Sequence, residues 1–173
     1  MNDLSAARAL VAAMRTSIGL VQKHDLETGA HLERMSRYSR LIASSLVNQG
    51  TATLDDEQIE QIALFSPLHD VGKIGIPDRV LQKPTKLNLD EREVMNTHTV
   101  MGRQIVDDLI TDFGFEQLPY IDYLRHITEL HHEAMDGSGY PHGLMGEEIK
   151  LEARITSVSD VFDALTTQRP YKK

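Results

Sequence analysis

Apolar residues recur every three or four positions along most of this chain, and no other feature constrains its fold as strongly. This is the repeat of an α-helix that buries one face. The repeat predicts helices over about residues 4–23, 28–47, 53–65, 90–109, 120–132 and 151–167. No segment alternates apolar and polar residues in the manner of a half-buried strand. The sequence therefore predicts an all-α bundle of about five to seven helices.

Local signals mark the ends of these helices and the loops between them. Residues 53–56 are typical of a helix start, and Asp90 followed by Glu93 resembles a capping box. Glycine and proline interrupt residues 72–89 and 133–148, which predicts loops with short turns. The second of these segments is long, and loops of that length usually carry function or are disordered.

Composition excludes several kinds of site. The chain has no cysteine, so disulfides, thiolate metal sites and cysteine nucleophiles are ruled out, in agreement with an expected location in the reducing cytoplasm. No stretch approaches the roughly 20 apolar residues of a membrane span, and the N-terminus lacks the basic start of a signal peptide. Aromatic residues are 5% of the chain, so the core must rely on Leu, Ile, Val, Ala and Met.

The charge balance argues against broad binding of DNA or RNA. The chain has 18 Lys and Arg against 26 Asp and Glu, a formal net charge of −8. Nucleic-acid binding needs basic patches that neutralise phosphates. A phosphate-ester substrate would therefore need local positive charge, for which metal ions are the natural source.

Histidines that lie beside other ligand types are the candidates for chemistry. His69-Asp70 and the pair His131-His132 each lie at a predicted helix end, and Asp160 lies on the last predicted helix. Histidine nitrogens together with carboxylate oxygens suit Fe, Mn, Ni or Zn. Adjacent ligands cannot point the same way from the middle of a regular helix, so they would reach different metals, or a carboxylate would bridge two. Taken singly, each group also fits a surface residue or a helix end, and spacing alone leaves both interpretations open.

Three longer motifs resemble those of a known family. His69-Asp70-Val71-Gly72-Lys73-Ile74-Gly75-Ile76-Pro77 is similar to the signature of the HD superfamily of phosphohydrolases. His131-His132-Glu133-Ala134-Met135-Asp136-Gly137-Ser138-Gly139-Tyr140-Pro141 resembles the second signature of the HD-GYP subfamily. The stretch from Arg154 through Asp160 to Lys172 follows the same pattern, so the resemblance covers roughly residues 25–173.

The resemblance implies an HD-domain helical bundle with a long Gly/Pro-rich loop. It also implies hydrolysis of cyclic di-GMP at two or three divalent metal ions, with iron favoured and Mn, Ni or Zn as alternatives. Positions that match the family's metal ligands are His31, His69, Asp70, His98, His131, His132 and Asp160. Glu27 matches the additional carboxylate of members that hold three metals, which would favour a second cut from pGpG to GMP.

The resemblance also implies roles in catalysis and substrate binding. Lys73 matches a lysine near the scissile phosphate, where it would act with Asp70. Arg169 and Lys172 match basic residues that hold substrate phosphates, and Tyr140 belongs to a loop that shapes the site. Met135 stands where many relatives carry an aromatic residue, and we expect it to pack under this loop. The histidines without a motif position are expected to be structural or at the surface, namely His24, His126 and His142.

Two segments are expected from the motif positions. Residues 1–24 would form a connector helix from an upstream sensory or receiver domain, and residues 25–173 would form the catalytic domain. Relatives usually continue past the Arg-Pro-Tyr-Lys segment, so a trimmed C-terminus is expected. The first helix offers a surface for a homodimer, and the Gly-Tyr-Pro loop is where a diguanylate cyclase would dock.

Alternative functions remain open on the sequence. The same scaffold could prefer another cyclic dinucleotide, such as 3′,3′-cyclic GMP-AMP, because no motif identifies the base pocket. A non-catalytic binding or scaffold module is a second alternative, although every ligand position is filled. A single-metal HD hydrolase is a third, and the paired histidines with Glu27 argue against it.

Overall fold

The computed structural model describes residues 11, 12 and 29–167. Its α-helices within 29–167 are α2 (Gly29–Asn48), α3 (Asp56–Phe65), α4 (Asp78–Leu81), α5 (Leu89–Asn96), α6 (His98–Phe113), α7 (Ile121–Leu130) and α8 (Leu151–Thr166). Three short 3₁₀ helices join them, η1 (Ser66–Leu68), η2 (Val71–Gly75) and η3 (Gly146–Glu148). No strand occurs in these residues, where a single bridge between Asp136 and Met145 crosses the long loop. The prediction of an all-α fold is confirmed.

Helix α3 begins where the sequence predicts, at a reciprocal cap. The side chain of Asp55 accepts the backbone N–H of Gln58 at 2.8 Å, and the Gln58 side chain accepts the N–H of Asp55 at 2.9 Å. These bonds satisfy backbone donors that the first turn of a helix leaves open.

The predicted cap at Asp90 and Glu93 is wrong by two residues. Helix α5 is capped by Asn88 and Glu91, which bond each other's backbone N–H at 2.8 and 2.9 Å. Asn88 has the extended backbone that a capping residue needs, with φ −74° and ψ −178°. Asp90 already lies inside the helix and has lost that geometry.

The single helix predicted over residues 90–109 is in fact two. Thr97 separates α5 from α6, and its hydroxyl donates to the carbonyl oxygen of Val94 at 2.6 Å. Helix α6 then continues to Phe113, because Gly114 adopts the left-handed conformation, φ 68°, that ends helices. The predicted loop over residues 72–89 contains η2 and the one-turn helix α4.

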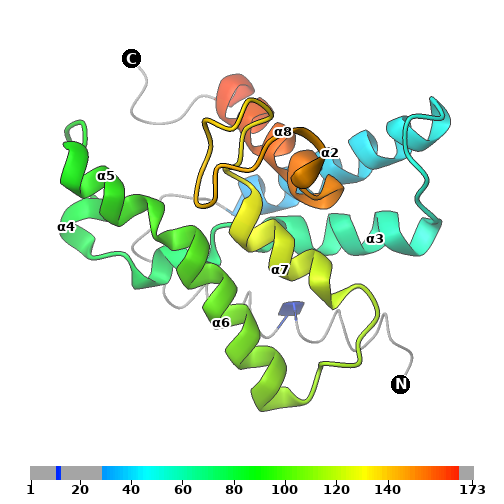
Figure 1. The fold of residues 1–173 in the computed structure, drawn as a ribbon, viewed down its shortest axis with the longest axis horizontal. Coiled ribbons are helices and arrows are strands. Elements are labelled where there is room, and N and C mark those ends of the chain that lie inside the picture. The colour runs from blue at the N-terminus through cyan, green and yellow to red at the C-terminus, as the bar shows by residue number, and fades with distance from the viewer. Residues whose placement is uncertain (1–10, 13–28, 168–173) are drawn as a thin grey trace.

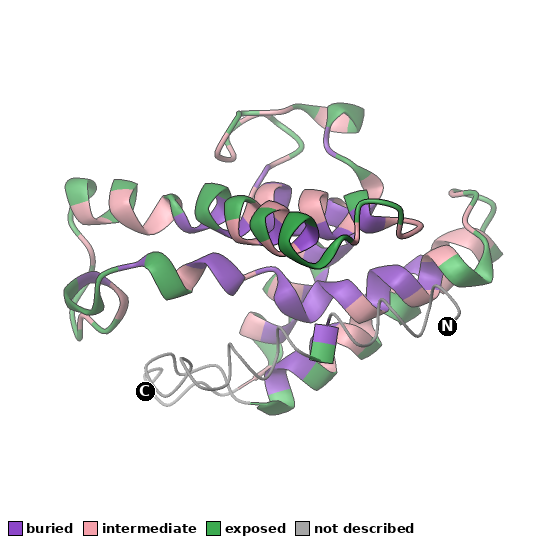
Figure 2. Ribbon diagram, turned by 90° about the horizontal axis from the view of Figure 1, so that it is seen from below, coloured by how far each residue is buried: buried purple, intermediate pink, exposed green. Residues whose placement is uncertain are grey.

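The helices pack around α2, α3, α7 and α8, as Figure 1 shows. Helix α2 lies against α3 and α8, and α7 lies against α6 and α8. Helices α4 and α5 extend to one side (Figure 1), and the long loop after α7 packs through Leu144 near Ala153 in the first turn of α8. Figure 2 shows buried residues lining the inner faces of these helices and exposed residues on their outer faces.

The core is built mainly of aliphatic side chains, as the composition predicts. Its largest cluster joins the end of α3 to α6 and α7 through residues such as Phe65, Leu68, Val106 and Leu124. Val11 is buried in the same cluster. Fully burying an aliphatic side chain stabilises a fold by about 1.5–3 kcal/mol, so this cluster fixes the end of α3 against α6 and α7.

Gly72 allows η2 to lie directly on α6. A Cβ atom at Gly72 would lie 1.9 Å from the carbonyl oxygen of His98 and 2.4 Å from the backbone nitrogen of Gly102. Contacts that short are impossible, so only glycine permits this approach. It brings the segment after His69-Asp70 against the first turn of α6.

Among the helices that the structure describes, none is both long enough and apolar enough to cross a membrane. Most of the helix predicted over residues 4–23 lies outside the described residues, so its connector and dimer roles stay predictions.

Candidate metal centre

Most of the predicted ligands lie at helix ends that converge. His31 lies in the first turn of α2, and His98 is the first residue of α6. His69-Asp70 occupies the break between η1 and η2, and His131-His132 directly follows α7. Adjacent residues inside a regular helix point in different directions. At a helix end the backbone leaves the helical conformation, so adjacent side chains can face the same site. Asp160 is the exception, because it projects from within α8.

The predicted ligands form two groups. The first ligand group contains Asp70, His98, His131 and His132. The second ligand group contains His31, His69 and Asp160. Within each group, one ligand atom from every residue lies within 4.8 Å of the others. Each group can therefore hold one metal ion.

Asp70 lies between the two groups. Its Oδ1 is 3.1 Å from His98 Nε2 and 3.7 Å from His131 Nε2. Its Oδ2 is 3.2 Å from Nε2 of His69, a member of the second group. Lys73 Nζ lies 2.7 Å from the same Oδ2. One carboxylate oxygen thus faces each group, as a ligand shared between two metals requires.

Backbone carbonyls fix the orientation of three histidines. His69 Nδ1 donates to Ser66 O at 2.9 Å, His98 Nδ1 to Met95 O at 2.8 Å, and His131 Nδ1 to Ile127 O at 2.9 Å. A proton on Nδ1 leaves the Nε2 lone pair free to bind a metal. All three rings therefore present Nε2 to the centre.

The donor atoms at the centre fit a cation. His98 Nε2 and His131 Nε2 lie 3.4 Å apart, and with Nδ1 protonated neither carries a hydrogen to share. Asp70 Oδ1 faces both nitrogens, is buried, and accepts no hydrogen bond from the described residues. Lone pairs that face one another without a proton repel, and a metal ion between them removes that repulsion.

The electrostatics keep the ligands in their metal-binding forms. Burial, together with the charge of His131, lowers the pKa of His132 to about 2. Burial also lowers the pKa of His131. Burial would raise the pKa of Asp70, but the charges of Lys73 and His69 hold it well below its usual range. At His131 and His132 the electrostatics thus favour neutral imidazoles beside the ionised carboxylate of Asp70.

The long loop closes one side of the centre. The Tyr140 ring stacks on His132 with ring centroids 4.8 Å apart, and the backbone N–H of Tyr140 donates to His132 O at 3.2 Å. Gly139 permits this fold-back, because a Cβ there would lie 2.2 Å from the backbone nitrogen of Ala134. The buried carboxylate of Glu133 accepts the N–H groups of His142 at 2.7 Å and Leu144 at 2.9 Å.

Several predicted residues fall outside the part of the chain that the structure describes. Glu27, Arg169, Lys172 and His24 are outside the described residues, so their assigned roles stay predictions.

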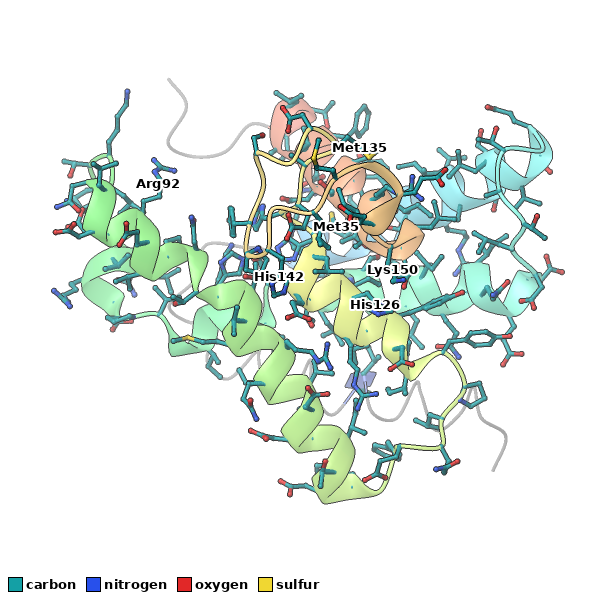
Figure 3. All side chains as sticks on the ribbon, viewed as in Figure 1. Met35, Arg92, His126, Met135, His142 and Lys150 are labelled. Atoms are coloured by element: carbon teal, nitrogen blue, oxygen red, sulfur yellow. The ribbon has the colours of Figure 1, made fainter. Side chains whose placement is uncertain are left out.

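The remaining histidines pair with acids away from the centre. His126 Nδ1 lies 2.5 Å from Glu152 Oε1, and His142 Nε2 lies 3.0 Å from Glu129 Oε1. In Figure 3, His126 lies on α7 and His142 lies on the long loop, where it approaches α7. The expectation that Met135 packs under the loop is wrong, because its side chain is 57% exposed.

Sequence reasoning missed two carboxylates beside the centre. Asp163, one turn after Asp160, accepts a hydrogen bond from His31 Nδ1 at 2.7 Å. Its place on the same face of α8 as Asp160 was the available signal. Glu133 immediately follows the histidine pair, but no spacing rule identifies the loop amides that it bonds.

Comparison with known proteins finds relatives over most of the chain. The HD domain family model matches residues 26–173. The chain is 46% identical over 153 residues to a cyclic di-GMP phosphodiesterase response regulator of Xanthomonas campestris pv. campestris, which covers 88% of the chain and 37% of the relative. It is 39% identical over 153 residues to a cyclic di-GMP phosphodiesterase of Thermotoga maritima. This alignment covers 88% of the chain and 38% of the relative. A 3′3′-cGAMP-specific phosphodiesterase of Vibrio cholerae is 38% identical over 152 residues. This alignment covers 88% of the chain and 27% of the relative. The chain thus spans well under half the length of these curated relatives.

Proposed function

We propose that this chain, which belongs to the HD domain family, is a metal-dependent phosphodiesterase that hydrolyses cyclic di-GMP. The observation that carries the proposal is the pair of ligand groups that share Asp70, with Lys73 Nζ 2.7 Å from the same carboxylate. Two relatives that are 46% and 39% identical carry the name of this activity.

The two ligand groups would hold two divalent metal ions, and Glu27 would complete a third position. When bound, such ions activate water and withdraw charge from phosphoryl oxygens. The nitrogen and carboxylate donors suit iron, which the family resemblance favours, and also Mn, Ni or Zn.

The chain's own side chains would orient the substrate and balance its charge. The Lys73 ammonium lies at the edge of the centre, where it can stabilise negative charge that develops on the scissile phosphate. Tyr140, stacked on His132, forms a wall against which the nucleotide would rest. Arg169 and Lys172 are proposed to hold the second phosphate, on the strength of their motif positions.

Cleavage of one phosphodiester bond opens the cyclic substrate to linear pGpG, and a second cut gives GMP. Glu27 would hold the third metal, whose positive charge would favour the second cut. A cyclic dinucleotide substrate and a cysteine-free chain support a cytoplasmic location. Docking of a diguanylate cyclase on the Gly139–Pro141 loop stays a prediction.

A second candidate substrate is 3′,3′-cyclic GMP-AMP. One relative at 38% identity is named as specific for that dinucleotide, at a level of identity close to that of the Thermotoga maritima relative. The two ligand groups serve either substrate, because both carry the same phosphodiester linkages. The choice therefore depends on contacts to the bases.

The test combines metal analysis with a substrate panel on one sample. The chain is purified without oxygen, its metal content is quantified, and cyclic di-GMP and 3′,3′-cyclic GMP-AMP are supplied in turn with Fe(II) or Mn(II). We expect at least two metals per chain and pGpG as the first product of cyclic di-GMP, separated by chromatography. Binding of cyclic di-GMP without turnover would contradict the proposal and favour a non-catalytic module.

A further inference from the structure

We propose that Asp163 is a positioning residue that controls occupancy of the metal position formed by the second ligand group, His31, His69 and Asp160. The inference rests on the proposed function, because it assumes that this group holds a metal. It goes further by assigning the two metal positions different sources of support within the fold.

Asp163 is held in one orientation beside His31. The residue is 1% exposed, and its Oδ2 accepts the Nδ1 proton of His31 at 2.7 Å. Arg34 bonds both carboxylate oxygens, with Nε 2.5 Å from Oδ1 and NH2 3.0 Å from Oδ2. The Thr167 hydroxyl donates to Oδ1 at 3.2 Å. Both oxygens are therefore engaged, and the carboxylate cannot turn away from the ring.

His31 differs from the other anchored histidines in where its support comes from. The Nδ1 atoms of His69, His98 and His131 donate to carbonyls only three or four residues earlier in the chain. The Nδ1 atom of His31, near the start of the described part of α2, donates to a carboxylate. Its partner is instead a side chain 132 residues away, on α8. Its orientation thus depends on the packing of α2 against α8.

The negative charge of Asp163 affects His31 as well as its position does. A carboxylate that accepts the Nδ1 proton fixes the tautomer and makes Nε2 a more basic ligand. The Arg34 guanidinium bonds both oxygens of Asp163, which favours the ionised form of this carboxylate. Arg34 lies one turn after His31 on α2 and balances the buried negative charge. A neutral backbone carbonyl does not supply this effect to the other three rings.

Asp163 and Asp160 lie one turn apart on α8. The same helix therefore supplies one ligand of the second group and the support of another. No member of the first ligand group bonds Asp163 in the described residues. A change at Asp163 should therefore weaken the second position and leave the first unchanged.

The test is a calorimetric titration in which Mn(II) is added to metal-free chain and the heat of binding is measured. Wild type is expected to bind at least two Mn(II) ions. In Asp163→Asn, which retains an oxygen acceptor but loses the charge, the affinity for one of these ions should fall about 10–100-fold while the other is unchanged. Asp163→Ala should lower the affinity for the same ion at least as much. Asp107→Asn removes a carboxylate that two arginines bond elsewhere and should change neither affinity.

A double variant separates positioning from general stability. In a His31→Ala background, Asp163→Asn should have no further effect on Mn(II) binding, because the ring that it orients is gone. A further loss of Mn(II) affinity in that background, an equal weakening of both ions, or wild-type affinity for both in Asp163→Asn would each overturn the proposal. So would loss of helical circular dichroism in Asp163→Asn, which would make Asp163 a folding residue. Failure of wild type to bind Mn(II) would instead contradict the proposed function.

Discussion

At the scale of single residues, the candidate centre depends on which imidazole nitrogen carries the proton. Three rings donate the Nδ1 proton to backbone carbonyls and one donates it to Asp163, which leaves Nε2 of all four rings as the possible metal-binding atom. Each of these hydrogen bonds fixes the tautomer and the ring orientation of one predicted ligand.

Replacement of His98 with Ala should empty the first ligand group. His98 Nε2 is 3.1 Å from Asp70 Oδ1, the oxygen that faces this group. We expect loss of one metal per chain and a fall in turnover of more than about 100-fold, because loss of a ligand should cost more than loss of a supporting hydrogen bond. Metal analysis and a cyclic di-GMP assay provide the measurements.

His126→Gln is the matched control, because His126 bonds Glu152 and lies in neither ligand group. It should keep wild-type metal content. His98→Ala with wild-type metal content and activity, and with intact helical circular dichroism, would show that the ligand assignment is wrong.

At the scale of elements, the long loop is fastened by one buried carboxylate. Glu133 accepts two backbone N–H groups, from His142 and Leu144. In Glu133→Gln one oxygen becomes an amide nitrogen, which faces a backbone donor and cannot accept from it. An unsatisfied buried donor costs about 1–3 kcal/mol, so the melting temperature should fall. The KM for cyclic di-GMP should rise more than kcat falls, because the loop carries Tyr140.

Hydrogen exchange at the amides of His142 and Leu144 would report the loosened loop directly. Glu129→Gln is the control, because Glu129 contacts His142 through the imidazole ring and not through the backbone. Unchanged protection of both amides in Glu133→Gln would refute this account of the loop.

The contact between α6 and α7 has its own pH dependence. Asp107 on α6 bonds Arg125 on α7 at 2.6 Å and Arg103 at 2.7 Å. Burial would raise the pKa of Asp107, but these two arginines lower it below the usual 3.8. The carboxylate's contribution is thus complete above the unfolded pKa and is lost as pH falls through the lower folded pKa.

Asp107→Asn should therefore destabilise the chain at neutral pH and have a smaller effect in acid. The side chain is 34% exposed, so solvent screening limits the loss to at most about 1 kcal/mol. Urea unfolding at pH 7 and near pH 3 measures the difference. A loss of stability that is equal at the two pH values would contradict the assigned role of the charge.

At the scale of the whole molecule, the ligands tie together distant parts of the chain. They come from α2, the junction of η1 and η2, α6, the end of α7, and α8. A metal that binds only the folded chain stabilises it by about 2.7 kcal/mol at a free concentration 100 times its Kd. Removal of the metal with a chelator should therefore lower Tm by about 5–10 °C for each such site in a domain of this size.

Restoring Mn(II) should restore Tm, with a dependence on metal concentration that follows from mass action. Differential scanning calorimetry of metal-free and metal-loaded chain measures the shift. His98→Ala should show a smaller shift than wild type. Equal Tm values for metal-free and metal-loaded wild type would contradict a centre that joins these helices.

The sequence by itself determined the fold class and the chemical types of the ligands. The helical repeat of apolar residues is a local property, so the all-α fold and most helix positions followed from it. The family motifs named seven ligands within the described residues, and all seven fall into the two groups. Helix ends were less predictable, because Asn88 displaced the expected cap and Thr97 divided an expected helix.

Only the tertiary structure decided how those ligands meet. The bond between His31 and Asp163 joins residues 132 positions apart. The Asp70 oxygens face His69 and His98 in a fold where η2 packs on α6 at Gly72. Sequence spacing fixes the direction of side chains along one helix, since the helix has a regular period. It does not fix the distance between helices, because that depends on how their apolar faces pack. The centre is therefore a list of donor atoms in the sequence, and only the folded chain brings these atoms together as two candidate metal positions.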